Sequence, residues 1–354
     1  MGETNIVRRR YLGNLDLFKT LLCIMLAGMH YQQAVGWLFP KFVFLTETFV
    51  YHYLVDAFFL ISGYVLTMSD TADKKSCRRS LLYRILRLYP SALLSCVFMF
   101  VMVWVIALLF EDSAPVEIPF TSFWMTAANF LFVDKGWFWA YIPSINFATW
   151  YLCVLIQCYI AFYAVKKISA CVSFSRGLLY FAVLSVTLAG HSCLERMPYI
   201  PFFNGYSLRG YVPFFAGCLL YEIYDKAKPT YINIMRGIGV LTGIASVLIF
   251  GWDNWYSAVL FIYPLILDIA VHTKQINSKV IKFTGSVLYG VYLWQGVIFY
   301  LMTVIYVRMG LPLEASLHVM LLFFAVCFGV SAFVYKFIER PFLKYMKNKE
   351  EQRK

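Results

Sequence analysis

Long apolar stretches recur along almost the whole chain, and short polar or basic segments separate them. A helix needs about 20 mostly apolar residues to cross the hydrocarbon core of a bilayer, and most of these stretches meet that length. The pattern therefore predicts an all-α fold, a polytopic membrane bundle of about ten transmembrane helices. The predicted spans are 15–36, 44–67, 89–110, 146–165, 177–190, 210–224, 233–251, 254–272, 286–307 and 315–337.

The composition supports this interpretation. Hydrophobic residues make up 61% of the chain and charged residues only 14%, whereas soluble domains carry about 25% charged residues. The first apolar stretch follows Arg8–Arg10 without a small-residue cleavage site. We therefore expect a retained span rather than a signal peptide, and a multi-pass protein of the cell (cytoplasmic) membrane.

Basic residues define the expected topology. With the N-terminus in the cytoplasm, 25 of the 31 lysines and arginines fall in inner segments and five in outer ones. Such an imbalance over short loops is the positive-inside pattern, so both termini are expected to be cytoplasmic. The net charge of +12 is spread over six separate inner segments, which suits anionic lipid and argues against nucleic-acid binding.

No change in composition marks a domain boundary. We expect a basic cytoplasmic segment at residues 1–14, a single transmembrane domain at 15–343, and a charged cytoplasmic tail at 344–354 that frays. The longest outer segment, about 111–145, is rich in aromatic residues. Aromatics form belts at membrane interfaces and can also stack on sugar rings; the belt is the preferred interpretation.

Lys19 and His30 both lie in the first predicted span. An ionisable residue there costs roughly 2.5–3.5 kcal/mol on insertion scales and usually faces a cavity with a function. The two positions are eleven residues apart, which returns His30 to the same helix face about 16 Å further along the axis. Asp16 shares the start of that face and is expected to pair with Lys19 or a loop arginine. The pattern predicts a reaction path across the membrane.

Seven short motifs follow one another along the chain: Asp16–Lys19 with His30, Val55–Tyr64, Arg84–Pro90, Thr149–Leu152, Pro213–Gly217, Gly285–Trp294 and Phe337–Pro341. In this order they resemble the motifs of acyltransferase family 3, a family of integral-membrane proteins, and the resemblance extends from about residue 14 to about residue 343. The second-span motif, Val55–Tyr64, is the most specific of the seven.

The resemblance implies an acyltransferase. Family members move an acyl group, commonly acetyl, from cytoplasmic acyl-CoA to a hydroxyl or amine, often of a surface or exported carbohydrate. The resemblance also implies acyl-CoA as co-substrate, no tightly bound cofactor, and a glycan, lipid-linked sugar or exported small molecule as acceptor. Three positions depart from the family pattern: Lys19 replaces arginine, Leu155 a glutamate and Gln295 a histidine. The last two departures leave a non-catalytic relative as one alternative.

His30 is the expected catalyst, with Asp16 supporting the site. An imidazole can accept the proton of an attacking hydroxyl or carry the acyl group itself; the alternative is a core histidine bonded to a backbone carbonyl. Lys19, Arg84 and Arg87 are the expected ligands of the CoA phosphates, because several cations together suit phosphate. The alternative for the two arginines is a role in topology alone.

The remaining candidates are assigned less specific roles. Asp56 needs a partner within its span, and Asp56, Trp150, Gln157 and Gln295 are expected near the acceptor or a pocket. Glu339 is expected to be a structural ion-pair anchor. No metal-ligand spacing occurs in the sequence. A transporter or flippase is the second functional hypothesis, although the two halves show no internal repeat or pair of broken helices.

Overall fold

The computed structural model describes residues 11–35, 53–70, 76–109, 122–139, 142–194, 197–226, 229–251, 254–310 and 316–351. Every regular element within these ranges is helical, which confirms the all-α prediction. The elements are α1 (Gly13–Val35), α2 (Leu54–Asp70), α3 (Cys77–Leu109), α4 (Phe123–Phe130), η3 (Phe147–Thr149), α5 (Trp150–Val172), α6 (Arg176–Ser192), α7 (Gly205–Lys226), α8 (Pro229–Phe250), α9 (Trp255–Ser257), η5 (Ala258–Ile262), α10 (Tyr263–His272), α11 (Lys279–Arg308), α12 (Leu317–Val334), η6 (Tyr335–Glu339) and α13 (Arg340–Glu351).

Six helical stretches of the described residues are long and apolar enough to cross a bilayer, so the protein is a polytopic helical membrane protein. They are 77–108, 147–172, 230–250, 255–272, 279–306 and 317–349. Each of the ten predicted spans falls on a helix where it is described. Residues 44–52 of the second span, and residues 1–10 and 352–354 of the terminal segments, lie outside the described residues. The total of ten spans stays a prediction.

Two helix ends differ from the sequence prediction. Helix α3 begins at Cys77, well before the predicted boundary at 89, so Arg84 and Arg87 lie on the same helix as the third span. The tail expected to fray is instead the helix α13. Pro341 is the second residue of α13, where the missing proline N–H removes no intrahelical hydrogen bond. The polypeptide therefore stays helical past Pro341.

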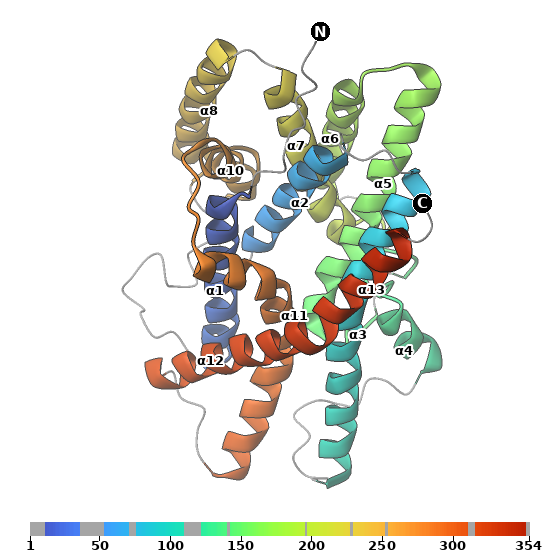
Figure 1. Ribbon diagram of the computed structural model, residues 1–354, viewed down its shortest axis with the longest axis vertical. Helices are drawn as coiled ribbons and strands as arrows, with labels where there is room; N and C mark the ends of the chain where they lie inside the picture. Colours follow the sequence, from blue (N-terminus) through green and yellow to red (C-terminus); the bar gives the residue numbers. More distant parts are fainter. Residues whose placement is uncertain are drawn as a thin grey trace.

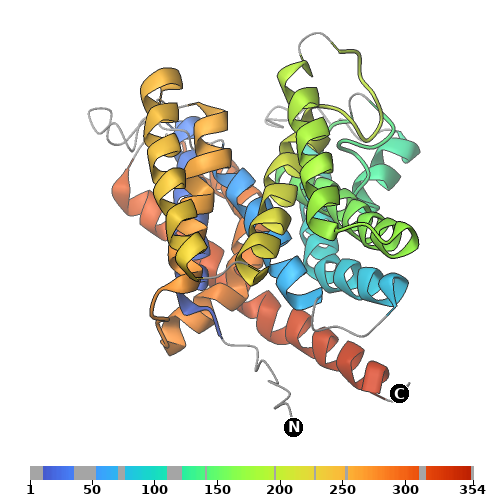
Figure 2. The same ribbon diagram turned by 90° about the horizontal axis from the view of Figure 1, so that it is seen from above.

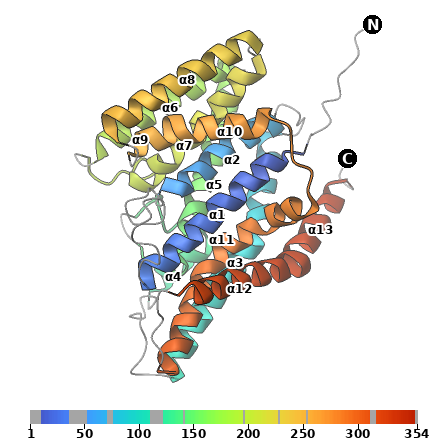
Figure 3. The ribbon, with the colours of Figure 1, turned by 90° about the vertical axis from the view of Figure 1, so that its left-hand side faces the viewer.

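Helices α2 and α7 form the centre of the bundle. In Figure 2 they lie between α8, α10 and α1 on one side and α3, α5 and α6 on the other. Helices α3 and α11 extend beyond the rest at one end, and α12 with α13 crosses the bundle obliquely (Figure 1). The start of α1 and the end of α13 lie on the same side (Figure 3). We call this the inner side.

Two glycines allow α2 and α7 to pack backbone against backbone. A Cβ atom at Gly63 of α2 would collide with the carbonyl group of Phe214, and one at Gly217 of α7 with that of Leu60. Small residues at helix contacts in membranes permit this close approach, where van der Waals packing replaces the hydrophobic effect. The contact fixes α7, and every side chain it carries, relative to α2.

On the outer side, the segment between α4 and α5 is held by buried polar side chains. Asn129 donates to the carbonyl of Pro143 at 2.9 Å, and Asn146 donates to that of Leu293 in α11 at 2.9 Å. Asp134 is 1% exposed and accepts hydrogen bonds from Ser144 and Cys153. Burial raises the pKa of this carboxyl group, while those hydrogen bonds act in the opposite direction. The segment is thereby fixed across α5 and α11.

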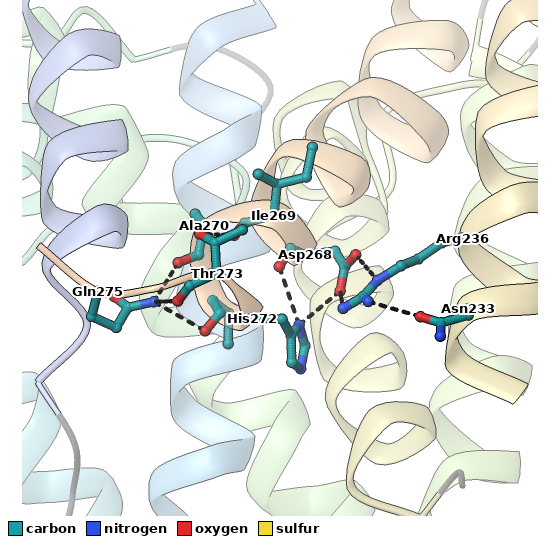
Figure 4. A network of polar contacts seen from close by, with 9 residues as sticks. Asn233, Arg236, Asp268, Ile269, Ala270, His272, Thr273 and Gln275 are labelled. Atoms are coloured by element: carbon teal, nitrogen blue, oxygen red, sulfur yellow. Dashed lines mark hydrogen bonds and ion pairs between the residues drawn. The ribbon is translucent and has the colours of Figure 1, made fainter. Parts of the chain in front are cut away.

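On the inner side, a charged cluster joins α8 to α10 (Figure 4). Asp268 is only 3% exposed, and Arg236 donates to its two carboxylate oxygens at 2.5 and 3.1 Å. The Nδ1 atom of His272 lies 2.7 Å from the same carboxylate. Helix α8 has few other contacts with the bundle, so this bidentate pair is its main polar attachment.

The start of α1 is attached to the connection between α10 and α11. Gln275 donates to the carbonyl groups of Ala270 and Thr273, which turns the chain after α10 (Figure 4). Asn14 of α1 donates to the Thr273 hydroxyl at 2.9 Å and accepts from the backbone N–H of Ile276 at 3.1 Å. These bonds fix the position of the start of α1, and so of its polar face, along the axis of the bundle.

The α2–α7 contact predicts unequal effects of two glycine substitutions. Gly217→Ala should destabilise the protein by roughly 1–3 kcal/mol, because the new methyl group meets backbone that cannot rotate away. Gly237→Ala on the exposed face of α8 is the matched control, since nothing lies within 4 Å of its Cβ position. It should be neutral or stabilising by up to about 1 kcal/mol. Thermal unfolding in detergent measures both, and equal melting temperatures would contradict the packing argument.

Candidate functional site

A cavity of about 390 Å³ lies between the start of α1, helices α2, α3, α5 and α11, and the turn η6. Few of its lining residues are ionised, and most of the others are apolar residues or tyrosines. The charged lining residues are Lys19, Arg84, Arg87 and Glu339, and the tyrosines are Tyr83, Tyr151, Tyr159, Tyr289, Tyr292 and Tyr335. The cavity therefore suits a ligand with an anionic part and an uncharged part.

The cavity runs along the helices. Val55 and Leu66 of α2 both line it, and eleven residues of helix correspond to about 16 Å. The charged residues come from the start of α1, the first half of α3 and the turn η6, all at the inner end. The opposite end is lined by Val55, Phe58, Tyr151 and Tyr292. The structure thus brings three of the predicted donor-site residues together at one mouth.

The two arginines at the mouth differ in their surroundings. Arg84 donates to the hydroxyl of Tyr163 at 3.0 Å and to that of Ser69 at 2.8 Å, which fixes its guanidinium group. Arg87 is exposed and makes no ion pair with another residue of the described ranges. The pair is one turn apart on α3, so both can face one ligand.

Lys19 pairs with Asp16 at 2.5 Å, one of the two partnerships the sequence predicted for Asp16. Asp16 also packs against Gly285 of α11, where a Cβ atom would lie 2.6 Å from the carboxylate carbon. Only glycine leaves room for the carboxylate at this position. Asp16 and Gly285 thereby fix the ammonium group of Lys19 at the cavity wall.

Glu339 was expected to be an ion-pair anchor, and that role stays a prediction. It makes no ion pair within the described part of the chain, although Arg87 is close enough to interact electrostatically. Glu339 ends η6, a π-helical turn, and lines the cavity. A π turn inserts an extra residue per turn and changes which side chains face inward. The carboxylate consequently faces the donor-site cations across the mouth.

His30 lies beyond the far end of the cavity and does not line it. Its ring meets Phe147 edge to face at 4.9 Å, and the side chain of Gln295 lies close enough to interact with the imidazole. Among the described residues, the Nδ1 atom of His30 and the Nε2 atom of Gln295 are both buried without a hydrogen-bond partner. Buried polar atoms are normally paired, so these two neighbouring atoms are available to a bound polar group.

Asp56 is completely buried and pairs with Arg209 of α7. The Nε atom of Arg209 lies 3.1 and 3.2 Å from the two carboxylate oxygens. Its guanidinium carbon lies 5.1 Å from the ring centre of Trp150, and Tyr206 packs against that ring at 6.1 Å. Trp150 thus belongs to an aromatic and cationic cluster at the outer start of α5.

Gln157 is placed differently from the prediction of a pocket residue. It is 2% exposed; its oxygen accepts from Ser207 at 2.8 Å and from Tyr211 at 3.2 Å. Its amide donates to the carbonyl of Lys135 at 3.4 Å. All of its polar atoms are used to join α5, α7 and the outer segment. Leu155, by contrast, does line the cavity, where it contributes apolar surface.

Three residues of the site were missed by the sequence analysis. Arg209 was counted as an outer-loop charge because the sixth span was expected to begin at 210, whereas α7 begins at Gly205. Its position four residues before Pro213 in the fifth motif is the only signal that could have found it. Tyr151 lies within the fourth motif and Tyr292 within the sixth, and nothing in their spacing indicated a cavity wall.

The fold and cavity define a polytopic helical membrane protein with an internal cavity that is cationic at one end. A family model described as an acyltransferase domain matches residues 12–336, and the chain belongs to this family, acyltransferase family 3. The resemblance noted in the motifs is thereby confirmed. The protein is a membrane acyltransferase of that family, which implies an acyl donor. Searches of curated proteins and of solved structures found no match.

The buried ion pair predicts a non-additive pair of substitutions. Arg209→Gln should lower the free energy of unfolding by roughly 3–5 kcal/mol, because it leaves the Asp56 carboxylate buried without a counter-charge. The double variant Asp56→Asn/Arg209→Gln should recover most of that loss, since neither residue is then charged. Equilibrium unfolding in detergent provides the comparison. A double variant no more stable than Arg209→Gln would show that the pair is not the relevant contact.

Proposed function

We propose that the protein transfers an acetyl group from cytoplasmic acetyl-CoA to a hydroxyl or amine of a surface or exported carbohydrate or a related acceptor. The observation that carries the proposal is the cavity, with its cationic mouth and uncharged walls. CoA has the matching polarity: an anionic nucleotide at one end and an uncharged pantetheine arm that bears the acyl group at the other.

Lys19, Arg84 and Arg87 bind the CoA phosphates in this proposal. Arg84 is fixed by its two hydroxyl contacts, so little conformational entropy is lost when it binds. Arg87 has no ion pair to break among the described residues. Asp16 holds Lys19 in position. Glu339 lines the same mouth, at the end of the turn η6 that precedes α13.

His30 acts as the general base, and Gln295 orients it. The acceptor oxygen attacks the thioester carbon while its proton moves to the unpaired Nδ1 atom of His30. The C–S bond then breaks with its electron pair on sulfur, and the imidazolium returns the proton to give free CoA. In a second route the imidazole takes the acyl group first and passes it to the acceptor. Both routes need His30 and no metal ion.

The acceptor is expected on the outer side of His30. Phe147, which contacts His30, is 44% exposed, and Trp150 with Arg209 lies one helical turn further along. Aromatic faces and a cation suit a sugar ring. Asp56 serves this end by holding Arg209. These contacts support a carbohydrate acceptor over an apolar one.

Acyl transfer can be distinguished from transport by the fate of the label. Membrane vesicles containing the protein are given acetyl-CoA with a radiolabelled acetyl group on the inner side only. The proposal requires covalent label on a glycan, lipid-linked sugar or exported small molecule. Movement of an unmodified solute without covalent label would support a transporter. If neither covalent label nor solute movement is observed, a non-catalytic relative would be supported.

Donor binding and chemistry should separate under substitution. Lys19→Ala should chiefly raise the KM for acetyl-CoA, because it removes a phosphate contact made equally in the ground and transition states. His30→Ala should chiefly lower kcat, by roughly 10²–10⁴-fold, because proton transfer matters only at the chemical step. Lys19→Arg should be tolerated, since it keeps the positive charge. Steady-state kinetics in vesicles measure all three.

His318→Ala is the matched control for the histidine substitution. His318 is exposed in α12 and does not line the cavity, so its removal should leave kcat and KM unchanged. Full activity of His30→Ala at a normal protein level would exclude His30 as the catalyst. Loss of turnover in Lys19→Ala with unchanged affinity for CoA would move Lys19 from the donor site to the chemistry.

Deleting the gene should remove one acyl group from an exported glycan or related molecule. In mass spectra of surface glycans, the deletion strain should lack about 42 Da per acetyl group, which is the mass of the C₂H₂O that acetylation adds. Complementation with the wild-type chain should restore the mass, and complementation with His30→Ala should not. Identical spectra for the deletion strain and its parent would exclude surface glycans as the acceptor.

A further inference from the structure

Two tyrosines line the end of the cavity that is furthest from the cations. The rings of Tyr151 and Tyr292 meet edge to face at 5.7 Å, and each side chain belongs to a residue only 9% exposed. Both line the cavity, one from the start of α5 and one from the middle of α11. We refer to them as the tyrosine wall. Any ligand that enters past the cations meets this wall at its far end.

The Tyr151 half of the wall is rigid. Its hydroxyl lies 3.1 Å from that of Ser62 and donates to the carbonyl of Phe58 at 3.4 Å. Phe59, which is fully buried, packs behind the ring at a centroid distance of 4.4 Å. A ring held at both its edge and its face cannot turn aside without breaking these contacts. The α2–α7 contact holds the α2 backbone that carries all three partners.

The Tyr292 half is held by packing alone. Its hydroxyl makes no hydrogen bond with the described residues, so truncating its side chain breaks no polar contact. Tyr292 is also one helical turn before Gln295, which lies beside His30. The tyrosine wall therefore lies at the end of the cavity nearest to the proposed catalytic histidine.

The cations and the wall fix a length between them. The α2 residues that line the cavity extend over about 16 Å of helix, and the anionic end of a donor is held at the mouth by Lys19, Arg84 and Arg87. We propose that the tyrosine wall restricts the donor to short acyl groups such as acetyl. A longer chain would have to displace Tyr292 or withdraw the phosphates from the cations. This inference rests on the proposed function, because it assumes an acyl-CoA in the cavity.

The test measures donor binding, so the acceptor need not be known. Purified full-length protein in detergent is titrated with acetyl-, butyryl- and hexanoyl-CoA, and dissociation constants are taken from the ligand-induced rise in melting temperature. Wild type should bind acetyl-CoA at least about tenfold more tightly than hexanoyl-CoA, within the range over which steric pockets discriminate methylene groups. Tyr292→Ala should remove or reverse this preference.

Two variants serve as controls. Tyr292→Phe keeps the ring and loses only the hydroxyl, so it should keep the wild-type preference for acetyl-CoA. Tyr335→Ala removes a tyrosine from the inner mouth; it can change overall affinity, but the ratio between chain lengths should stay the same. If Tyr292→Ala does not fold, Tyr292→Leu, which keeps more of the buried volume, replaces it.

The outcomes are distinct. Equal binding of all three donors by wild type, or an unchanged preference in a folded Tyr292→Ala or Tyr292→Leu variant, would overturn the role of the wall and leave the proposed function standing. A wild-type protein that binds no acyl-CoA of any length would overturn the proposed function together with the inference. Loss of the preference for acetyl-CoA in Tyr292→Phe would show that the hydroxyl group selects the acyl chain length. That result would also overturn the role of the wall.

Discussion

A charge inside a bilayer must be paired or must face a polar cavity, and the described spans of this protein obey that constraint closely. Asp56 of α2 is paired with Arg209 of α7, and Asp268 of α10 with Arg236 of α8. The first pair joins helices that are distant in sequence, and the second joins two consecutive spans. The pairs thus hold neighbouring helices together, and apolar packing fills the space between them.

The same constraint explains the position of the cavity. Lys19 forms an ion pair with Asp16, but its side chain still lines the cavity together with Arg84 and Arg87. Charges without full compensation need water or a ligand, and the mouth supplies that environment at the side where acyl-CoA would be available. Further in, the cavity is lined by tyrosine and aliphatic side chains. The change from one environment to the other occurs within a few turns of helix.

The helices and one face of α1 could be predicted from the sequence because they depend on local patterns. Hydrophobic runs determine the spans, and the three-residue spacing of Asp16 and Lys19 determines their pairing. The partner of Asp56 could not be predicted, since Arg209 is 153 positions away and only the tertiary contact of α2 with α7 brings it near. Gln157, Tyr151 and Tyr292 depend in the same way on how three or more helices meet. The helical tail after Pro341 was missed because its residues are charged.

The distribution of charge along the cavity has an electrical consequence. Beyond Lys19, Arg84, Arg87 and Glu339, no ionised residue lines it among the described parts of the chain. Moving one elementary charge through a membrane at 100 mV involves about 2.3 kcal/mol of work. In the proposed reaction CoA keeps its phosphates at the mouth, and only a neutral acyl group passes further. The membrane voltage would then neither drive nor oppose the transfer, and its direction would be determined by the free energy of the thioester.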